Sequence, residues 1–448
     1  MSNETGRFDR VVSLAAWRDS LSEMGPAWVA GAIAAGPATM ASLLTAGASF
    51  GYALLWVVVL SAVLGAFAQY LSVRVGLATE SGIVTAVERH LGERWAWLLV
   101  ADTVLAAGLA QLVIMKGLAD VSAAVTGLDA RIWGVAWAVV LAVGLAGRGY
   151  RFVELVAKVL VAAVVIAFLA SLAVVPVDPV AAAGGLVPSL PGGVDGALVA
   201  AGVLGGAVHV TLVTMHTYTV RARGWTERDR GLATFDVGAS MLVAFGVYSV
   251  AIFLVAAGVL RGSAAAADGL SAIEAGQALG PLVGPSAEWL FLLGLLGAAV
   301  STLGGNTVAP PFLLADKLGW ETDVSDDRYR ALLAGFALLS ALGVFVGGAF
   351  FPLLVLVLAF GLVGTPFALV VVLALLHADG VAVDLPRGVT AAGGVLVAVA
   401  AVLAGNFARG HVTPFPPAEP LSAAVTVFAG VLGLATIVLA GQSLRGAF

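Results

Sequence analysis

Two long apolar segments, about 170 residues apart, are each interrupted by residues that break or loosen a helix. The first interruption lies within 30–39, where Gly36 and Pro37 stand in the middle of the apolar run, and the second lies within 203–211, which contains Gly205 and Gly206. In a lipid bilayer an interrupted helix leaves backbone polar groups that need a partner from protein, water or ligand. Two interruptions in corresponding places of the two halves of a chain therefore predict a central binding site between them.

The composition supports a membrane environment for the whole chain. The sequence is 60% hydrophobic and 11% charged, whereas soluble domains are about 45–50% apolar and about 25% charged. The class is therefore an all-α polytopic membrane protein, with the lipid bilayer and a transported small solute or metal cation as its expected partners. The net charge of −5 does not indicate a nucleic-acid partner, and the lack of cysteine excludes disulfides and thiolate metal sites. No cofactor is expected, and the oligomeric state stays open.

Apolar runs long enough to cross a bilayer recur from end to end of the chain. We expect about twelve spans, at roughly 25–47, 52–76, 95–123, 132–147, 152–175, 194–220, 232–260, 286–312, 329–347, 351–377, 388–406 and 421–444.

The distribution of positive charge predicts the orientation of these spans. With the N-terminus in the cytoplasm, 18 of the 22 Lys and Arg residues lie on cytoplasmic segments. Three lie on external segments, namely Arg131, Arg261 and Arg409, and Lys116 lies within a span. Because cytoplasmic loops carry an excess of Lys and Arg, both termini are expected in the cytoplasm of a cell-membrane protein.

The spans divide into two similar blocks of five. We expect a cytoplasmic segment at 1–24, a first block at 25–175, an external connector at 176–193, a second block at 194–377 and two accessory spans at 378–448. An odd number of spans in each block gives the two blocks opposite topologies. Since the first span of each block is the interrupted one, the pattern predicts an inverted repeat with its binding site at the repeat interface.

Several motifs lie within or beside these spans: Gly25-Pro26, TAGASFGYALLW at 45–56, QYLSVRVG at 69–76, GYRFVE at 149–154, Ser301-Thr302 and PFAL at 366–369. They resemble the Nramp family of divalent-metal transporters, over about 25 to 377 and most specifically in the first two spans. The resemblance implies a LeuT-type fold with a 5+5 inverted repeat and broken helices 1 and 6. It also implies a secondary transporter for proton-coupled uptake of Mn(II), Fe(II) or a related cation by alternating access.

The sequence departs from this family at the interruptions themselves. The family's first interruption carries Asp-Pro-Gly-Asn, where this sequence carries Gly36-Pro37-Ala38-Thr39. The family's second carries Met-Pro-His, where this sequence carries His209-Val210-Thr211. The family's second histidine aligns with His216, and its glutamine in the tenth helix falls at Leu358. The metal-binding aspartate and methionine are thus replaced.

The expected substrate site combines backbone and small polar groups from both interruptions: Ala35, Gly36, Pro37, Thr39, Gly206, His209 and Thr211. Moving even a monovalent ion into low dielectric costs about 20 kcal/mol in the idealised limit, and a carboxylate usually offsets that cost. Neither interrupted segment contains Asp or Glu. His209 is the expected metal ligand, since neutral imidazole suits transition metals. The alternative is a packing histidine bonded to neighbouring backbone.

Further polar residues lie within the spans. Asp102 and His216 are candidates for a proton relay, since intramembrane ionisable residues are functional by default. The alternatives are a buried neutral or ion-paired carboxyl and an interfacial histidine. Ser301 and Thr302 stand where LeuT-type proteins often bind a coupling sodium ion, or else bond to their own helix.

Two functions with different substrates follow from these residues. The first is transport of a divalent metal cation, and the second is transport of a small organic solute, such as an amino acid or amine, by the same fold. Loss of the family's Asp, Asn and Met at Gly36, Thr39 and His209 favours the second. An intramembrane enzyme is not expected, because the sequence has no His-Glu-x-x-His motif and no histidine placed to activate a serine. A transporter-like sensor would need a large soluble output domain, which this sequence does not contain.

Overall fold

A computed structural model describes residues 36–147, 150–262, 270–381, 383, 385–412 and 420–446. Every regular element in these ranges is a helix. Nine helical stretches within them are long and apolar enough to cross a membrane, and two shorter apolar helices occupy Ala130–Ala146 and Lys158–Ser171. The prediction of an all-α polytopic membrane protein is therefore confirmed.

The helices follow the predicted spans. They are α4 (Pro37–Phe50), α5 (Leu55–Thr79), α7 (Glu93–Thr126), α8 (Ala130–Gly147), α9 (Tyr150–Ser171), α11 (Val194–Val208), α12 (Val210–Ala222), α13 (Arg230–Val237), α14 (Gly246–Val259), α18 (Ala287–Leu318), α19 (Asp327–Leu339), α20 (Phe350–His377), α21 (Arg387–Val412) and α22 (Pro420–Leu444). Short helices α6 (Ile83–His90) and α10 (Pro179–Gly184) lie in the connections. The predicted 1–24 segment, the first part of the first span and Ala35 lie outside the described residues.

The second predicted interruption is present, but three residues later than Gly206. Helix α11 runs through Gly206 to Val208, and α12 starts at Val210. Between them His209 has an extended backbone, with φ −55° and ψ 138°. Its ring nitrogen Nδ1 accepts a hydrogen bond from the backbone N–H of Thr211, and so caps the start of α12. The helix therefore breaks at His209, whose side chain accepts the backbone N–H of Thr211 that has no partner within α12.

At the first interruption, α4 begins at Pro37. Gly36 precedes it with an extended backbone, at φ −68° and ψ 179°. Proline suits the first position of a helix because its missing N–H would have no partner there. The N-terminal end of α4 lies inside the bundle, where Pro37, Ala38 and Thr39 are all buried.

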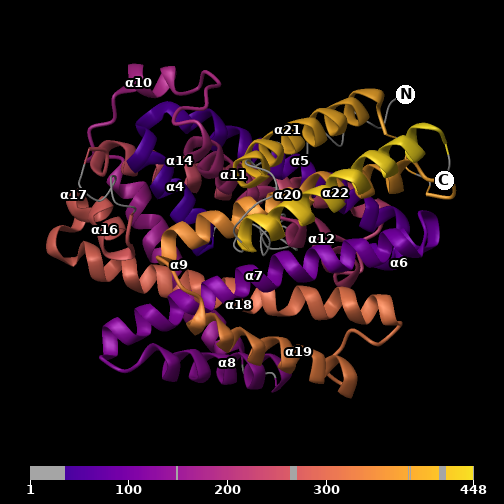
Figure 1. The fold of residues 1–448 in the computed structure, drawn as a ribbon, viewed down its shortest axis with the longest axis horizontal. Helices are drawn as coiled ribbons and strands as arrows, with labels where there is room; N and C mark the ends of the chain where they lie inside the picture. The colour runs from indigo at the N-terminus through magenta and orange to yellow at the C-terminus, as the bar shows by residue number, and fades with distance from the viewer. Residues whose placement is uncertain are drawn as a thin grey trace.

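Helices that are far apart along the chain pack against one another (Figure 1). Helix α4 packs on α14, and the interrupted pair α11 and α12 packs on α5. In an inverted repeat the first span corresponds to the sixth, and the second span corresponds to the seventh. The contact of α4 with α14 then corresponds to the contact of α11 and α12 with α5. Helices α7 and α18 run side by side, and α8 packs on α19 beyond them. Helices α21 and α22 pack on α20 and on each other.

The end of α12 is held by a polar network centred on Asp316 of α18. The hydroxyl of Tyr218 donates to Oδ2 of Asp316 at 2.7 Å, and the backbone N–H of Thr85 donates to the same oxygen at 3.2 Å. The hydroxyl of Thr85 donates to Oδ1. The backbone N–H of Ile83 also donates to Oγ1 of Thr217 at 3.0 Å. One half of the interrupted helix is therefore fastened to both α6 and α18.

Candidate functional site

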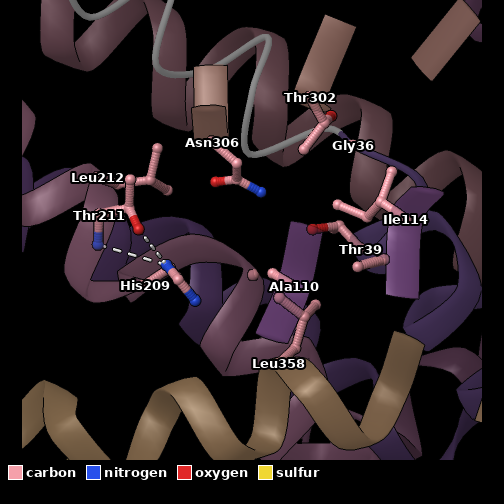
Figure 2. A pocket seen from close by; sticks show the side chains of 12 residues that line it. Gly36, Thr39, Ala110, Ile114, His209, Thr211, Leu212, Thr302, Asn306 and Leu358 are labelled. Atoms are coloured by element: carbon pink, nitrogen blue, oxygen red, sulfur yellow. Dashed lines mark hydrogen bonds between the residues drawn. The ribbon is translucent and has the colours of Figure 1, made fainter. Parts of the chain in front are cut away.

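A cavity lies where the two interruptions meet (Figure 2). Its volume of about 40 Å³ is room for about three water molecules at 10–15 Å³ each. Its lining comes from α4, α7, α11, α12, α18 and α20, together with the residues at the breaks: Gly36, Ala38, Thr39, Ala110, Ile114, Gly206, His209, Thr211, Leu212, Thr302, Asn306 and Leu358. The start of α4 and the break between α11 and α12 thus face one cavity.

Most of the residues predicted for the substrate site line this cavity. Five of them do so, namely Gly36, Thr39, Gly206, His209 and Thr211. The two interruptions touch directly, because the side chain of Thr39 lies against Gly206 and a Cβ at Gly206 would collide with it. Pro37 is buried at the start of α4 but is not part of the lining, and Ala35 lies outside the described residues.

One ring nitrogen of His209, Nδ1, already has hydrogen-bond partners in the protein. Nδ1 lies 3.3 Å from the backbone nitrogen of Thr211 and 3.0 Å from its hydroxyl (Figure 2). The backbone contact fits a ring that carries its proton on Nε2, whereas the shorter contact with the hydroxyl fits a proton on either nitrogen. Nε2 is buried, has no hydrogen bond to the described residues and lies beside Gly361 of α20. His209 therefore combines a cavity-lining position with the backbone bond of a packing histidine, and its Nε2 offers a lone pair to a metal when the ring proton is on Nδ1.

The polar lining is neutral. Hydroxyls come from Thr39, Thr211 and Thr302, and an amide comes from Asn306. The lining includes no carboxylate, and the described part of the chain holds no cluster of three His, Cys, Asp or Glu residues suited to a metal. The cavity can offer oxygen ligands and one imidazole, but no negative charge of its own.

Of the two residues predicted for a coupling ion, only Thr302 reaches the cavity. Its hydroxyl is buried and has no hydrogen bond to the described residues. Ser301, one position earlier on α18, is half-buried and does not line the cavity. Consecutive residues of an α-helix are rotated by about 100° around its axis, so the side chains of Ser301 and Thr302 do not share one face.

Asp102 lies on α7, away from the cavity lining. Its side chain is 1% exposed, and neither carboxylate oxygen has a hydrogen bond among the described residues. The carboxylate packs against Gly364 of α20, where a Cβ would collide with it. A buried carboxyl group with both oxygens unpaired is costly unless it is neutral or meets a partner in another state.

His216 lies two turns along α12 from His209. Its Nε2 is 2.8 Å from Oε1 of Gln69 on α5, and its Nδ1 is buried without a partner in the described ranges. Nε2 of Gln69 in turn lies 3.1 Å from the sulfur of Met241. His216 is buried within the bundle at 1% exposure.

Several lining residues lay outside the predicted site: Ala38, Ala110, Ile114, Leu212, Asn306 and Leu358. Ala38 and Leu358 carry a signal only through the family resemblance, and Ala110, Ile114 and Leu212 carry none that separates them from ordinary span residues. Asn306 does carry one, because it follows Thr302 by four residues and precedes Pro310 by four. The spacing places Asn306 and Thr302 on one helix face.

A helical membrane bundle in which α4 and the interrupted pair α11 and α12 meet at a central cavity belongs to the class of secondary transporters. The chain is a member of the Nramp family, because the model for "Natural resistance-associated macrophage protein-like" matches residues 27–409.

Curated relatives agree with this membership. The chain is 32% identical over 327 residues to the divalent metal cation transporter MntH of Mycobacterium tuberculosis (strain ATCC 25618 / H37Rv), covering 71% of this chain and 75% of the relative. It is 30% identical over 357 residues to MntH of Acidiphilium cryptum (strain JF-5), covering 77% of this chain and 81% of the relative.

Solved structures share the fold. A manganese transporter from Eremococcus coleocola, crystallised with an aromatic bis-isothiourea substituted compound, matches with a TM-score of 0.75 at 16% identity, over 97% of this chain and 96% of that one. The nucleobase-cation-symport-1 family transporter Mhp1 matches with a TM-score of 0.54 at 15% identity, over 94% and 91%. The fold is of the LeuT type, as expected.

Proposed function

We propose that this protein carries a divalent metal cation across the cell membrane by alternating access, with the cation held between the two interruptions. The observation that carries this proposal is the cavity lined by Thr39, Gly206 and His209, where α4 meets the break between α11 and α12. Membership of the Nramp family and the cation-transporting relatives support it. The protein acts as a transporter rather than as an enzyme.

The ion is proposed to bind partly hydrated. A cavity of about 40 Å³ holds an ion with about two or three waters, at 10–15 Å³ per water. Hydroxyl, amide and carbonyl oxygens are ligands that suit hard divalent cations such as Mn²⁺. Since no lining side chain is a carboxylate, retained water replaces the contact that aspartate supplies elsewhere in the family.

Proton coupling is proposed through Asp102 and His216. Both are buried in the bundle and have polar atoms without a partner in the described ranges. Such groups are costly in a membrane unless another state of the transport cycle satisfies them. Asp102 takes up and releases the driving proton in this proposal, and His216 passes protons along α12.

The orientation follows from the charge distribution along the sequence. Both termini are proposed to lie in the cytoplasm, with α6 on the cytoplasmic side and α10 on the external side. The five-plus-five division at 25–175 and 194–377 is part of this proposal.

A small organic solute is the competing substrate. The neutral lining of threonine hydroxyls and one amide favours it, because such groups bind polar organic molecules as readily as ions. The small volume of the cavity counts against it, since an amino acid is much larger than three waters.

The deciding experiment uses purified protein in proteoliposomes. We expect externally added Mn²⁺ to enter and quench a trapped metal-sensitive dye, faster with an inward proton gradient. Calorimetry with Mn²⁺, Fe²⁺ and a panel of amino acids and amines identifies the ligand, with His209→Ala as the control variant. Heat on adding an amino acid or amine, with none on adding any divalent cation, would overturn the proposal. A metal signal unchanged in His209→Ala would remove His209 as a ligand.

A further inference from the structure

The wall of the cavity opposite the interruptions is formed by α18. Thr302 and Asn306 stand one turn apart on this helix, and both side chains project toward the cavity (Figure 2). Asn306 is only 6% exposed, and it lines the cavity. No hydrogen bond joins its amide to the described residues, so the amide is available to water or to a ligand in the cavity.

The backbone at Asn306 is also short of a partner. Helix α18 continues through Pro310 and Pro311 without a break. Proline has no N–H, and the residue four positions earlier therefore loses its usual helical donor. The carbonyl groups concerned are those of Asn306 and Thr307. Asn306 thus carries an unpaired side-chain amide and a backbone carbonyl that its own helix does not bond through the usual N–H.

The neighbouring polar side chains form hydrogen bonds with other groups and not with Asn306. Gln111 of α7 donates instead to the hydroxyl of Thr307 at 2.9 Å and to the carbonyl of Phe336 at 3.2 Å. Thr307 donates in turn to the carbonyl of Leu303 at 2.6 Å. The next residue along α18 is therefore bonded into the protein, while Asn306 and Thr302 are left facing the cavity.

We infer that Asn306 is a direct substrate ligand, whose side-chain oxygen binds the transported divalent cation, with the hydroxyl of Thr302 beside it. The inference rests on the proposed function. Gly36 before α4 and Leu358 on α20 offer no side-chain oxygen to a cation. The inference assigns to α18 the oxygen ligands that are missing at these two positions. Amide and hydroxyl oxygens are neutral hard donors, which suit a cation that keeps some of its water.

Three variants separate a ligand role from a structural one. Asn306→Ala removes the oxygen, Asn306→Asp keeps an oxygen at nearly the same place, and Leu293→Ala alters an exposed residue of the same helix. In proteoliposomes we expect the KM for Mn²⁺ to rise at least tenfold in Asn306→Ala. The Asp variant should stay within threefold of wild type or bind more tightly, and Leu293→Ala should match wild type. Calorimetric titration with Mn²⁺ should follow the same order, with equal thermal stability in apo protein.

The outcomes separate the inference from the proposed function. Wild-type Mn²⁺ transport together with an Asn306→Ala KM within twofold of wild type overturns the inference alone. Equal losses in the Ala and Asp variants show that the amide N–H₂ matters rather than the oxygen, which also overturns a cation ligand. If the wild-type protein neither transports nor binds any divalent cation, the proposed function is overturned, and the inference is overturned with it.

Discussion

The network around Asp316 makes a quantitative prediction about α12. This half-helix packs against α5 and α20, and its end is tied to α18 through Tyr218 and to α6 through Thr217. If α12 moves during the transport cycle, the network favours the state in which α12 is docked. Tyr218→Phe removes one hydroxyl and keeps the aromatic ring against Phe312, whose ring centroid lies 5.4 Å away.

The size of the effect follows from the geometry of the bond. The Tyr218 hydroxyl lies 2.7 Å from Oδ2 of Asp316, which is the length of a charge-assisted hydrogen bond. Such bonds contribute about 1.5–3 kcal/mol, and Asp316 is partly exposed, so the lower end applies. A loss of about 1.5 kcal/mol changes an equilibrium constant about tenfold. We therefore expect about a tenfold larger undocked population.

Cysteine alkylation measures this population directly, because the chain has no cysteine of its own. Thr214 is fully buried on α12, and Thr214→Cys is close to it in volume. A thiol there reacts with a small maleimide only when α12 undocks, so its rate follows the undocked population. We expect the rate to rise about tenfold when Tyr218→Phe is added, in line with about 1.5 kcal/mol.

The control removes a comparable hydroxyl at the other end of the bundle. Tyr52 accepts a hydrogen bond from the backbone N–H of Asp178 at 3.2 Å, beside α10. Tyr52→Phe should leave the alkylation rate unchanged. Asp316→Asn should raise the rate, and adding Tyr218→Phe to it should have less effect than in wild type, since the two groups share one bond. A rate within twofold of the parent in Tyr218→Phe would refute the network as a restraint on α12.

Three more predictions test other parts of the structure. Asp102→Asn should keep Mn²⁺ uptake down its own gradient and reduce the component driven by a pH gradient at least tenfold; an unchanged pH-driven component in proteoliposomes would remove Asp102 from the relay. Thr365→Val removes the donor to the carbonyl of Val208, now 3.0 Å away, and leaves a buried carbonyl beside the break unpaired, at a cost of about 1–3 kcal/mol; thermal unfolding in detergent should shift to lower temperature. Leu128→Cys and Glu321→Cys, both exposed, should react with an impermeant maleimide from outside and inside the cell respectively, and the reverse pattern would invert the proposed topology.

Much of the fold could be read from the sequence because a bilayer constrains the backbone locally. In lipid every N–H and C=O must be bonded within its own segment, so a long apolar run can only become a helix. The described helices therefore follow the predicted spans closely. Interruptions were predictable for the same reason, since Pro37 cannot continue a helix that begins before it. The neutral character of the site was equally visible, because neither interrupted segment holds an acid.

The position of the second break was less predictable. Glycines at 205 and 206 suggested a break there, yet α11 passes through both. In the folded protein Gly206 lies against Thr39, and Gly205 lies against the backbone of Leu358 on α20. These glycines provide close packing between helices rather than a break. The break falls at His209, where Nδ1 caps the new helix.

The sequence by itself determined the class of protein, the helical spans, the paired interruptions and the absence of charge between them. These are local properties, because backbone hydrogen bonding in lipid and helix-breaking residues act within one segment. Only the tertiary structure decided which side chains face the cavity. It placed Asn306 and Thr302 in the wall, turned Ser301 out of it, and set Asp102 against Gly364 of a distant helix. The rotation of each helix is set by its packing partners, which lie far away in the chain.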